Sequence, residues 1–273
     1  MRGKAPMARP FVLAVFLVLA AGQASALAGS PEDLVGLPAW DRVPTPNGSG
    51  SSGELHGVQA FSATNVWVVG HTGTSTLTER WNGSSFSVVP SPSIANRSSI
   101  LEDVDGVAPN DLWTVGHADV TSFVGSRSLA LHWNGSSWTR IATPSVGKST
   151  AFNDLTGVAA VASNDVWAVG TFQGGTGGNT FHALIQHWNG TAWSLVRNDC
   201  GRGLNKVDAR SATDIWAVGG SDTCHWNGSS WTRFPVGPPP NQQGFVNLSD
   251  VTVIGATNAW AVGDQATSCG EGQ

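Results

Sequence analysis

Two histidines that directly follow a recurring glycine are the side chains of this chain best placed for ligand chemistry. His71 follows Gly70, and His117 follows Gly116. The same place further along the chain is taken by Thr171, Gly220 and Asp264. Imidazole binds metals, transfers protons and forms hydrogen bonds near neutral pH. A position that differs between copies of a repeat is a candidate for function, because a position that only maintains the scaffold tends to stay the same.

Acidic side chains in the neighbouring loops extend this candidate set. These loops differ in length from one repeat to the next, and uneven loops on a rigid scaffold are where binding usually resides. We therefore expect a ligand-binding face that contains His71, His117, Asp119, Asp222 and Asp264. No catalytic residue, metal ligand or cofactor is assigned, because the chain has neither zinc-type Cys/His spacing nor a G-x-S-x-G motif.

A repeated unit of about 50 residues accounts for most of the other unusual side chains. It contains Asn/Asp-x-Trp-x-Val-Gly, then His/Arg-Trp-Asn-Gly, then an aromatic residue, and its first tryptophans are Trp67, Trp113, Trp167, Trp216 and Trp260. All 13 tryptophans fall on repeat positions. So do His132, His187 and His225. We interpret these side chains as scaffold, and the Asp or Asn before each first tryptophan as a side chain that closes its own turn.

Each unit is predicted to form four short antiparallel strands. The first strand is marked by Gly57-Val58, Gly106-Val107 and Gly157-Val158, and the second is a continuous apolar run. Asn-Gly between the third and fourth strands predicts a two-residue type I′ turn. That turn pairs Trp133 with Ser136 and Leu131 with Trp138, so both tryptophans lie on one face. Four-stranded units of this period are typical of β-propeller blades.

The predicted fold is therefore all-β, a β-propeller of four-stranded antiparallel blades over residues 36–273. Residues 36–46 resemble an isolated fourth strand. Joined to the last repeat they would close the ring and remove exposed sheet edges. The blades are expected at about 55–92, 101–145, 155–198, 204–236, and 248–273 plus 36–46. Five closed blades and a fragment of a larger propeller both stay open as interpretations.

The N-terminus has the pattern of a secretory signal peptide. Arg2, Lys4 and Arg9 precede an apolar run over residues 11–21, which is too short to span a bilayer. Small residues around Ala28 fit a cleavage site. We expect residues 1–28 to be the signal peptide, residues 29–35 to be a linker, and the mature protein to be secreted into the extracellular space.

Charge and cysteine content restrict the partners further. The net charge is −5, and removal of the positive N-terminal segment makes it more negative. Binding to nucleic acid or to an anionic membrane is thus disfavoured, and no membrane insertion is expected. In an oxidising compartment we expect a disulfide between Cys200 and Cys224, which leaves Cys269 without that partner.

The motifs at residues 166–170, VWAVG, and at residues 225–231, HWNGSSW, resemble kelch-type and galactose-oxidase-like propeller repeats. They also resemble tryptophan-rich repeats of secreted bacterial proteins. The resemblance covers residues 36 to about 265 and implies the fold, but it implies no activity. The chain contains no Tyr, so mechanisms that need a Tyr nucleophile or a Tyr radical are excluded for it.

Our leading functional hypothesis is a secreted, non-catalytic binding or scaffold propeller. It would recognise an extracellular polymer, such as a glycan, or a protein through the variable loops. Two alternatives stay open. One is an extracellular polysaccharide-active hydrolase or lyase, and the other is a structural repeat segment of a longer surface protein.

Overall fold

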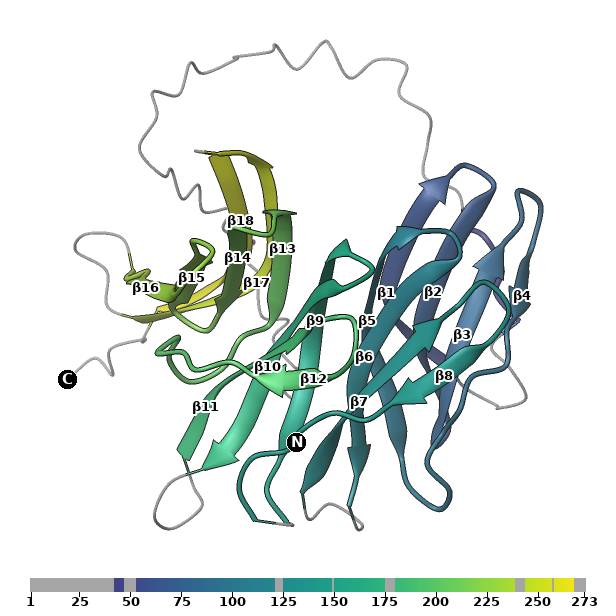
Figure 1. Ribbon diagram of the computed structural model, residues 1–273, viewed down its shortest axis with the longest axis horizontal. Coiled ribbons are helices and arrows are strands. Elements are labelled where there is room, and N and C mark those ends of the chain that lie inside the picture. The colour runs from purple at the N-terminus through teal and green to yellow at the C-terminus, as the bar shows by residue number, and fades with distance from the viewer. Residues whose placement is uncertain are drawn as a thin grey trace, which may run out of the picture.

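The computed structural model describes residues 42–46, 53–120, 125–148, 150–174, 180–238, 244–256 and 258–267. The regular structure in this part of the chain is β-strand, arranged in antiparallel sheets that follow one another along the sequence (Figure 1). Across these ranges, no helix has the length and apolar character needed to cross a membrane.

Each of the first four sheets contains four strands that are consecutive in the chain. Blade one consists of β1 (Gly53–Ser62), β2 (Asn65–Thr72), β3 (Ser75–Trp81) and β4 (Phe86–Val88). Blade two consists of β5 (Ser99–Ala108), β6 (Asp111–Asp119), β7 (Ser126–Trp133) and β8 (Trp138–Ile141). Blade three consists of β9 (Asn153–Ala162), β10 (Asp165–Gly174), β11 (Thr180–Trp188) and β12 (Trp193–Leu195).

Blade four and a smaller fifth sheet complete the described array. Blade four consists of β13 (Lys206–Ser211), β14 (Asp214–Gly219), β15 (Asp222–Trp226) and β16 (Trp231–Pro235). The fifth sheet, which we call blade five, pairs β17 (Gly244–Gly255) with β18 (Asn258–Thr267).

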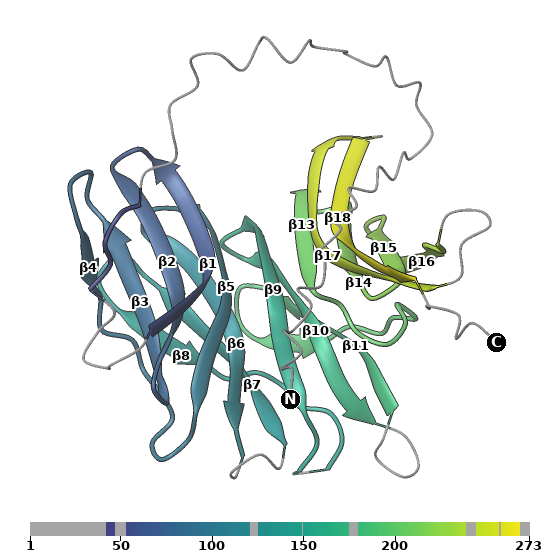
Figure 2. The ribbon, with the colours of Figure 1, turned by 180° about the vertical axis from the view of Figure 1, so that it is seen from behind.

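The first strands of the blades gather side by side. β1 packs along β5, β5 along β9, β9 along β13, and β13 along β17 (Figures 1 and 2). The later strands of each sheet lie progressively further from this row. Sheets that radiate from a row of inner strands are propeller blades. The predicted all-β fold of four-stranded antiparallel propeller blades is therefore confirmed.

Trios of tryptophans join adjacent blades. The ring of Trp67 in blade one lies 4.9 Å from Trp133 and 5.5 Å from Trp138 of blade two, between centroids. The same trio recurs at the next two junctions, as Trp113, Trp188 and Trp193, and as Trp167, Trp226 and Trp231. Trp67 and Trp113 are almost completely buried. The scaffold interpretation of these tryptophans is confirmed.

The turn between the third and fourth strands is longer than predicted. Trp133 pairs directly with Trp138, and Leu131 pairs with Arg140. The predicted pairings of Trp133 with Ser136 and of Leu131 with Trp138 are therefore wrong. The two tryptophans nevertheless share a face, because direct cross-strand partners always do.

The side chain of Asn134 explains this longer turn. Its Oδ1 atom accepts hydrogen bonds from the backbone N–H groups of Ser136 and Ser137, both at 3.0 Å. Among the four residues of this loop, 134–137, only Gly135 adopts a positive φ, of 92°. A type I′ turn would need a positive φ at the asparagine as well. The asparagine instead closes a four-residue loop through its side chain.

The first strand of blade two is also shifted from its prediction. The expected marker, Gly106-Val107, lies too far along the chain. Val104 is the residue that pairs with Thr114, as Val58 of blade one pairs with Val68. Val104 is 3% exposed, whereas Val107 is 40% exposed. In blade two, Val104 rather than Gly106-Val107 therefore occupies the packed position of the first strand.

The disulfide joins Cys200 to Cys224, the pair expected from the sequence, with 5.8 Å between their Cα atoms. Both residues are buried, and the bond ties the segment before blade four to β15. Cys269 lies outside the described residues.

Ring closure stays a prediction. Residues 42–46 belong to no strand, and residues 36–41 lie outside the described part of the chain. The expected signal peptide, residues 1–28, and the linker, residues 29–35, lie outside it too.

Candidate functional site

A glycine recurs in the second half of the second strand of each blade, where the backbone of the first strand comes too close to leave room for a side chain. In blade one the first strand bulges at His56, between Leu55 and Gly57. A Cβ atom on Gly70 would collide with the carbonyl oxygen of Glu54. A β-bulge re-aims the side chain of the extra residue. In blades one, two, three and five a bulge of this kind lies in the first half of the first strand, and a second irregularity lies near the other end of that strand.

The residue at this bulge, which we call the bulge position, differs between blades: His56, Glu102, Thr156 and Ser249. In blade four the same place is taken by Asn205, which directly precedes β13, and we include it under this name. In blade three, the Thr156 hydroxyl donates a hydrogen bond to the carbonyl oxygen of Leu204 at 2.8 Å. In blade four, Asn205 Nδ2 donates to the carbonyl oxygen of Leu248 at 2.6 Å. Both bonds reach the next blade, so in these two blades the bulge position has a scaffold role.

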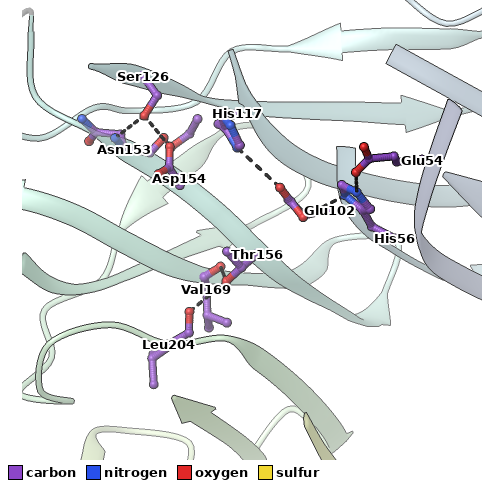
Figure 3. Close-up of polar contacts among 11 residues, drawn as sticks. Glu54, His56, Glu102, His117, Ser126, Asn153, Asp154, Thr156, Val169 and Leu204 are labelled. Carbon is purple, nitrogen blue, oxygen red and sulfur yellow. Dashed lines mark hydrogen bonds and ion pairs between the residues drawn. The ribbon is translucent and has the colours of Figure 1, made fainter. Parts of the chain in front are cut away.

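Blades one and two use the bulge position differently. Nδ1 of His56 lies 3.0 Å from Oε2 of Glu102, across the boundary between the blades (Figure 3). The other carboxylate oxygen of Glu102 lies 3.8 Å from Nδ1 of His117. The ring of His56 also meets the ring of His71, at 5.5 Å between centroids. In blades one and two, contacts between titratable side chains thus take the place of the side-chain-to-carbonyl hydrogen bonds of blades three and four.

Glu54 completes a group that we call the histidine–glutamate cluster: Glu54, His56, His71, Glu102 and His117. Glu54 on β1 is the direct cross-strand partner of His71 on β2. The Nδ1 atoms of His71 and His117 are buried and form no hydrogen bond within the described part of the chain. Buried polar atoms without a partner are uncommon in folded proteins and call for an explanation.

Two of the five predicted ligand residues, His71 and His117, are brought together in this cluster. The three aspartates are placed elsewhere. Asp222 forms hydrogen bonds of 2.6 and 3.0 Å with the guanidinium of Arg233, between β15 and β16. Asp264 accepts a hydrogen bond from Asn247 at 3.2 Å in blade five. Asp119 is the last residue of β6. The five residues therefore do not form a single site.

Glu54, His56 and Glu102 were missed by the sequence analysis. They belong to the first strand, which the repeat marked as scaffold. The available signal was the variation at the residue after its leucine, which is His56, Glu102 or Thr156 in the first three blades. The same kind of variation had singled out His71 and His117.

The histidines on repeat positions are scaffold. Nε2 of His132 lies 2.8 Å from Oδ1 of Asp111, and the imidazole packs on Trp113 at 4.6 Å between centroids. The same pairing recurs as His187 with Asp165 and as His225 with Asp214. In blade one, Arg80 donates to Asn65 at 3.2 Å instead. In these blades the recurring Asp or Asn therefore bonds to a side chain of the third strand. The prediction that it closes its own turn is wrong.

Buried carboxylates bridge the inner strands of blades two and three. Asp103 accepts a hydrogen bond from the N–H of Val158 at 3.0 Å and lies 2.7 Å from the ammonium group of Lys206. Asp105 accepts from the N–H of Ala160 and from the amide of Gln59, both at 2.8 Å. No cation lies within ion-pair distance of Asp105 among the described residues.

Burial raises the pKa of Asp105 from 3.8 to about 6. The N–H groups of Ala160 and Gly106 oppose this rise, and the negative charges of Asp103 and Asp208 add to it. Burial likewise raises the pKa of Asp103, against the opposing charge of Lys206. The inner strands therefore hold a carboxyl group that is costly to ionise.

Replacing Asp105 with asparagine is expected to stabilise the protein at neutral pH. The raised pKa means that the folded state binds the proton more tightly, so stability falls as pH rises from about 4 to 6. Asparagine carries no charge, still accepts from Ala160, and can donate to a rotated Gln59 amide. Urea unfolding should show the Asp105→Asn variant about 2 kcal/mol more stable at pH 7.5 and nearly unchanged at pH 4. A difference of the same size at both pH values would contradict the raised pKa.

A separate hollow lies on blade three beside β11 and β12. Its volume is about 400 Å³, and its lining includes Phe172, His182, Arg197 and Asp199. The rings of Phe172 and His182 are stacked at 5.2 Å between centroids. This hollow is a second place where a small ligand could bind, and it shares no residue with the histidine–glutamate cluster.

Comparisons with known proteins give only remote likenesses. No protein-family profile and no curated protein matches the chain. A fungal lectin from Aleuria aurantia, a six-bladed propeller with a fucose recognition mode, is 13% identical with a TM-score of 0.47, and 78% of each chain is covered. An α-L-arabinanase of Penicillium chrysogenum is 11% identical with a TM-score of 0.43, over 76% of this chain and 73% of that one.

An α-L-arabinofuranosidase of Fusarium graminearum is similar at the same level. It is 12% identical with a TM-score of 0.41, over 74% of this chain and 72% of that one. Likenesses of this size carry no argument about the activity or ligand of this chain, so its function has to be argued from its own residues.

Proposed function

We propose that this chain is a secreted, non-catalytic binding propeller. It recognises an extracellular polymer, a glycan in the first place, through the end of the propeller that carries the bulge positions. A protein partner is the other outcome that the test below distinguishes. One observation carries the proposal, namely that the blades repeat the same scaffold contacts but differ from one another at this end.

Two positions per blade show this difference. The bulge position holds His56, Glu102, Thr156, Asn205 and Ser249, and the position after the recurring glycine of the second strand holds His71, His117, Thr171, Gly220 and Asp264. Elsewhere the tryptophan trios and the histidine–aspartate pairs recur from blade to blade. Variation that is confined to one end of a repeated scaffold supports a binding face there.

The chemistry of this end favours a polar ligand without strong negative charge. Imidazole, amide and hydroxyl groups donate and accept hydrogen bonds, and an ionised carboxylate accepts them. Such groups match the hydroxyl groups of a polysaccharide. The net charge of −5 disfavours a polyanion as the partner.

A glycan array combined with pull-down from extracellular material tests this proposal. We expect the protein to retain at least one glycan class, and we expect His117→Ala to weaken that binding about tenfold, the loss of one or two hydrogen bonds. The matched control is Arg140→Ala, a charge-removing change at an exposed position of β8, which should leave binding unchanged. Failure to retain any partner would contradict the proposal and favour a purely structural repeat segment.

The hydrolase or lyase hypothesis predicts a different result in the same material. It requires the protein to release new reducing ends from a polysaccharide, and Glu102→Gln to abolish that release. Retention of a glycan without turnover would support the binding proposal. Loss of binding in Arg197→Ala but not in His117→Ala would move the site to the hollow on blade three.

Secretion is part of the proposal and rests on the N-terminal sequence pattern. N-terminal sequencing of protein recovered from culture medium is expected to begin close to residue 29. Recovery of the uncleaved chain from inside the cells would contradict it.

A further inference from the structure

We infer that Glu54, His56 and His71 form a binding site for one divalent transition-metal ion, in the first place Zn²⁺, with Glu102 as a positioning residue. This site goes beyond the proposed function and does not depend on it. A metal site in blade one could exist whether or not the propeller binds a glycan.

The three side chains offer a suitable set of donor atoms. One ring nitrogen from each histidine and one carboxylate oxygen of Glu54 lie within 4.8 Å of one another. Zn²⁺ binds nitrogen and oxygen at about 2.0 to 2.2 Å, so donors on one ion lie about 3 to 4 Å apart. The Glu54 side chain is 70% exposed and free to rotate by the small amount required. Two imidazoles and one carboxylate leave at least one position open for water or a ligand oxygen.

Glu102 orients His56 for this role. Its Oε2 atom lies 3.0 Å from Nδ1 of His56, an ion-pair contact that leaves Nε2 as the ring nitrogen turned away from Glu102. Nε2 is the atom that faces Glu54, at 3.7 Å from Oε2. A metal-binding histidine almost always donates its other N–H to a carboxylate or carbonyl in this way.

A simple ion pair explains the Glu54 side of the cluster less well. The 3.7 Å between His56 Nε2 and Glu54 Oε2 is too long for a hydrogen bond. An exposed ion pair at this distance contributes little free energy. A metal ion between the two atoms would account for their facing each other across a gap.

His71 provides a second, independent observation. Its Nδ1 atom is buried and has no hydrogen-bond partner among the described residues. Its ring lies against the ring of His56 at an angle of 64°. The backbone places it there, because His71 is the cross-strand partner of Glu54. The imidazole that carries this unpartnered nitrogen lies next to a second imidazole and a carboxylate, in a group whose donor atoms could hold a metal ion.

The repeat shows that this trio is not a scaffold feature. The corresponding trio is Ile100, Glu102 and His117 in blade two, and Asp154, Thr156 and Thr171 in blade three. Within the described residues, a group with metal-binding geometry is present in blade one alone. The scaffold therefore does not require these side chains at these positions.

Titration calorimetry on the untagged full chain, stripped of metal by chelation and dialysis, tests the site. We expect one Zn²⁺ per chain with a dissociation constant in the micromolar range or below. Co²⁺, used as a spectroscopic probe, should give visible absorption bands that saturate at one equivalent. Glu54→Gln should weaken binding about tenfold or more, and His71→Ala should abolish it. Glu102→Gln should keep the stoichiometry of one and weaken binding about 10- to 100-fold.

His182→Ala is the matched control, because His182 stacks on Phe172 away from the cluster. It should bind Zn²⁺ as the unaltered chain does. Far-UV circular dichroism reports whether each variant folds, and Glu54→Gln, at an exposed side chain, keeps the test valid if His71→Ala does not fold. Unchanged stoichiometry and affinity in Glu54→Gln, or no Zn²⁺ binding by the unaltered chain, would overturn the inference.

Discussion

Gly116→Ala should lower the free energy of unfolding by about 3 kcal/mol or more. Gly116 lies in β6, opposite the point where β5 bulges at Glu102. A Cβ atom at this position would collide with the carbonyl oxygen of Ile100 and with the Cα of Leu101. These are backbone atoms in a paired strand, so no side-chain rotation relieves the collision. Urea unfolding followed by far-UV circular dichroism measures the loss.

Gly237→Ala is the control for this substitution. Gly237 is exposed, and a Cβ atom there would meet nothing within 4 Å. Alanine at an unstrained glycine leaves stability unchanged or raises it by up to about 1 kcal/mol, because it restricts the unfolded chain. Equal losses at both positions would show that β5 does not bulge against Gly116. The same experiment tests the geometry that places Glu102 beside His56.

The tryptophans made the fold predictable from the sequence. A repeat that places Trp67, Trp113 and Trp167 at the same point of an apolar run identifies the second strand of each blade without any structure. Burial of large aromatic side chains dominates the energetics of packing. The side chains that decide the fold were therefore also the most conspicuous ones in the sequence.

Register was less predictable, because single side chains and inserted residues decide it. Asn134 forms hydrogen bonds to its own loop and so replaces the two-residue turn that Asn-Gly suggests. The bulge at Glu102 adds one residue to β5, and the valine that packs in this strand is Val104 rather than Val107. The asparagine bonds leave the apolar pattern unchanged, and the bulge shifts the alternation by one residue, so a search for a fixed period detects neither.

The candidate site was predictable only in part, because it lies between blades. His71 and His117 could be singled out by their variation within the repeat. Their link is Glu102, which contacts His56 in the neighbouring blade. Contacts between blades depend on how far each strand is shifted by its bulge. The sequence alone does not indicate which residues of two repeats meet.

Trp113→Ala should cost about 4 kcal/mol of unfolding free energy, the usual range for a buried tryptophan in a packed core. Trp113 is 1% exposed and packs against Trp188 and Trp193 of the next blade. Its removal leaves a cavity at the junction of blades two and three. The loss is measured by urea unfolding followed by far-UV circular dichroism, which does not depend on tryptophan fluorescence.

Trp260→Ala tests whether the cost of removing a tryptophan comes from its packing between blades or from its position in the repeat motif. Trp260 holds the same motif position as Trp113 but is 39% exposed, so its removal should cost only about 1 kcal/mol. Blade one shows the complementary feature, since Trp81 and Phe86 pair with each other at 5.2 Å in the places that Trp188 and Trp193 hold in blade three. A loss at Trp260 as large as that at Trp113 would contradict this exposure. It would mean that the outer face of blade five is covered in solution, with the Trp81–Phe86 face of blade one as the matching surface.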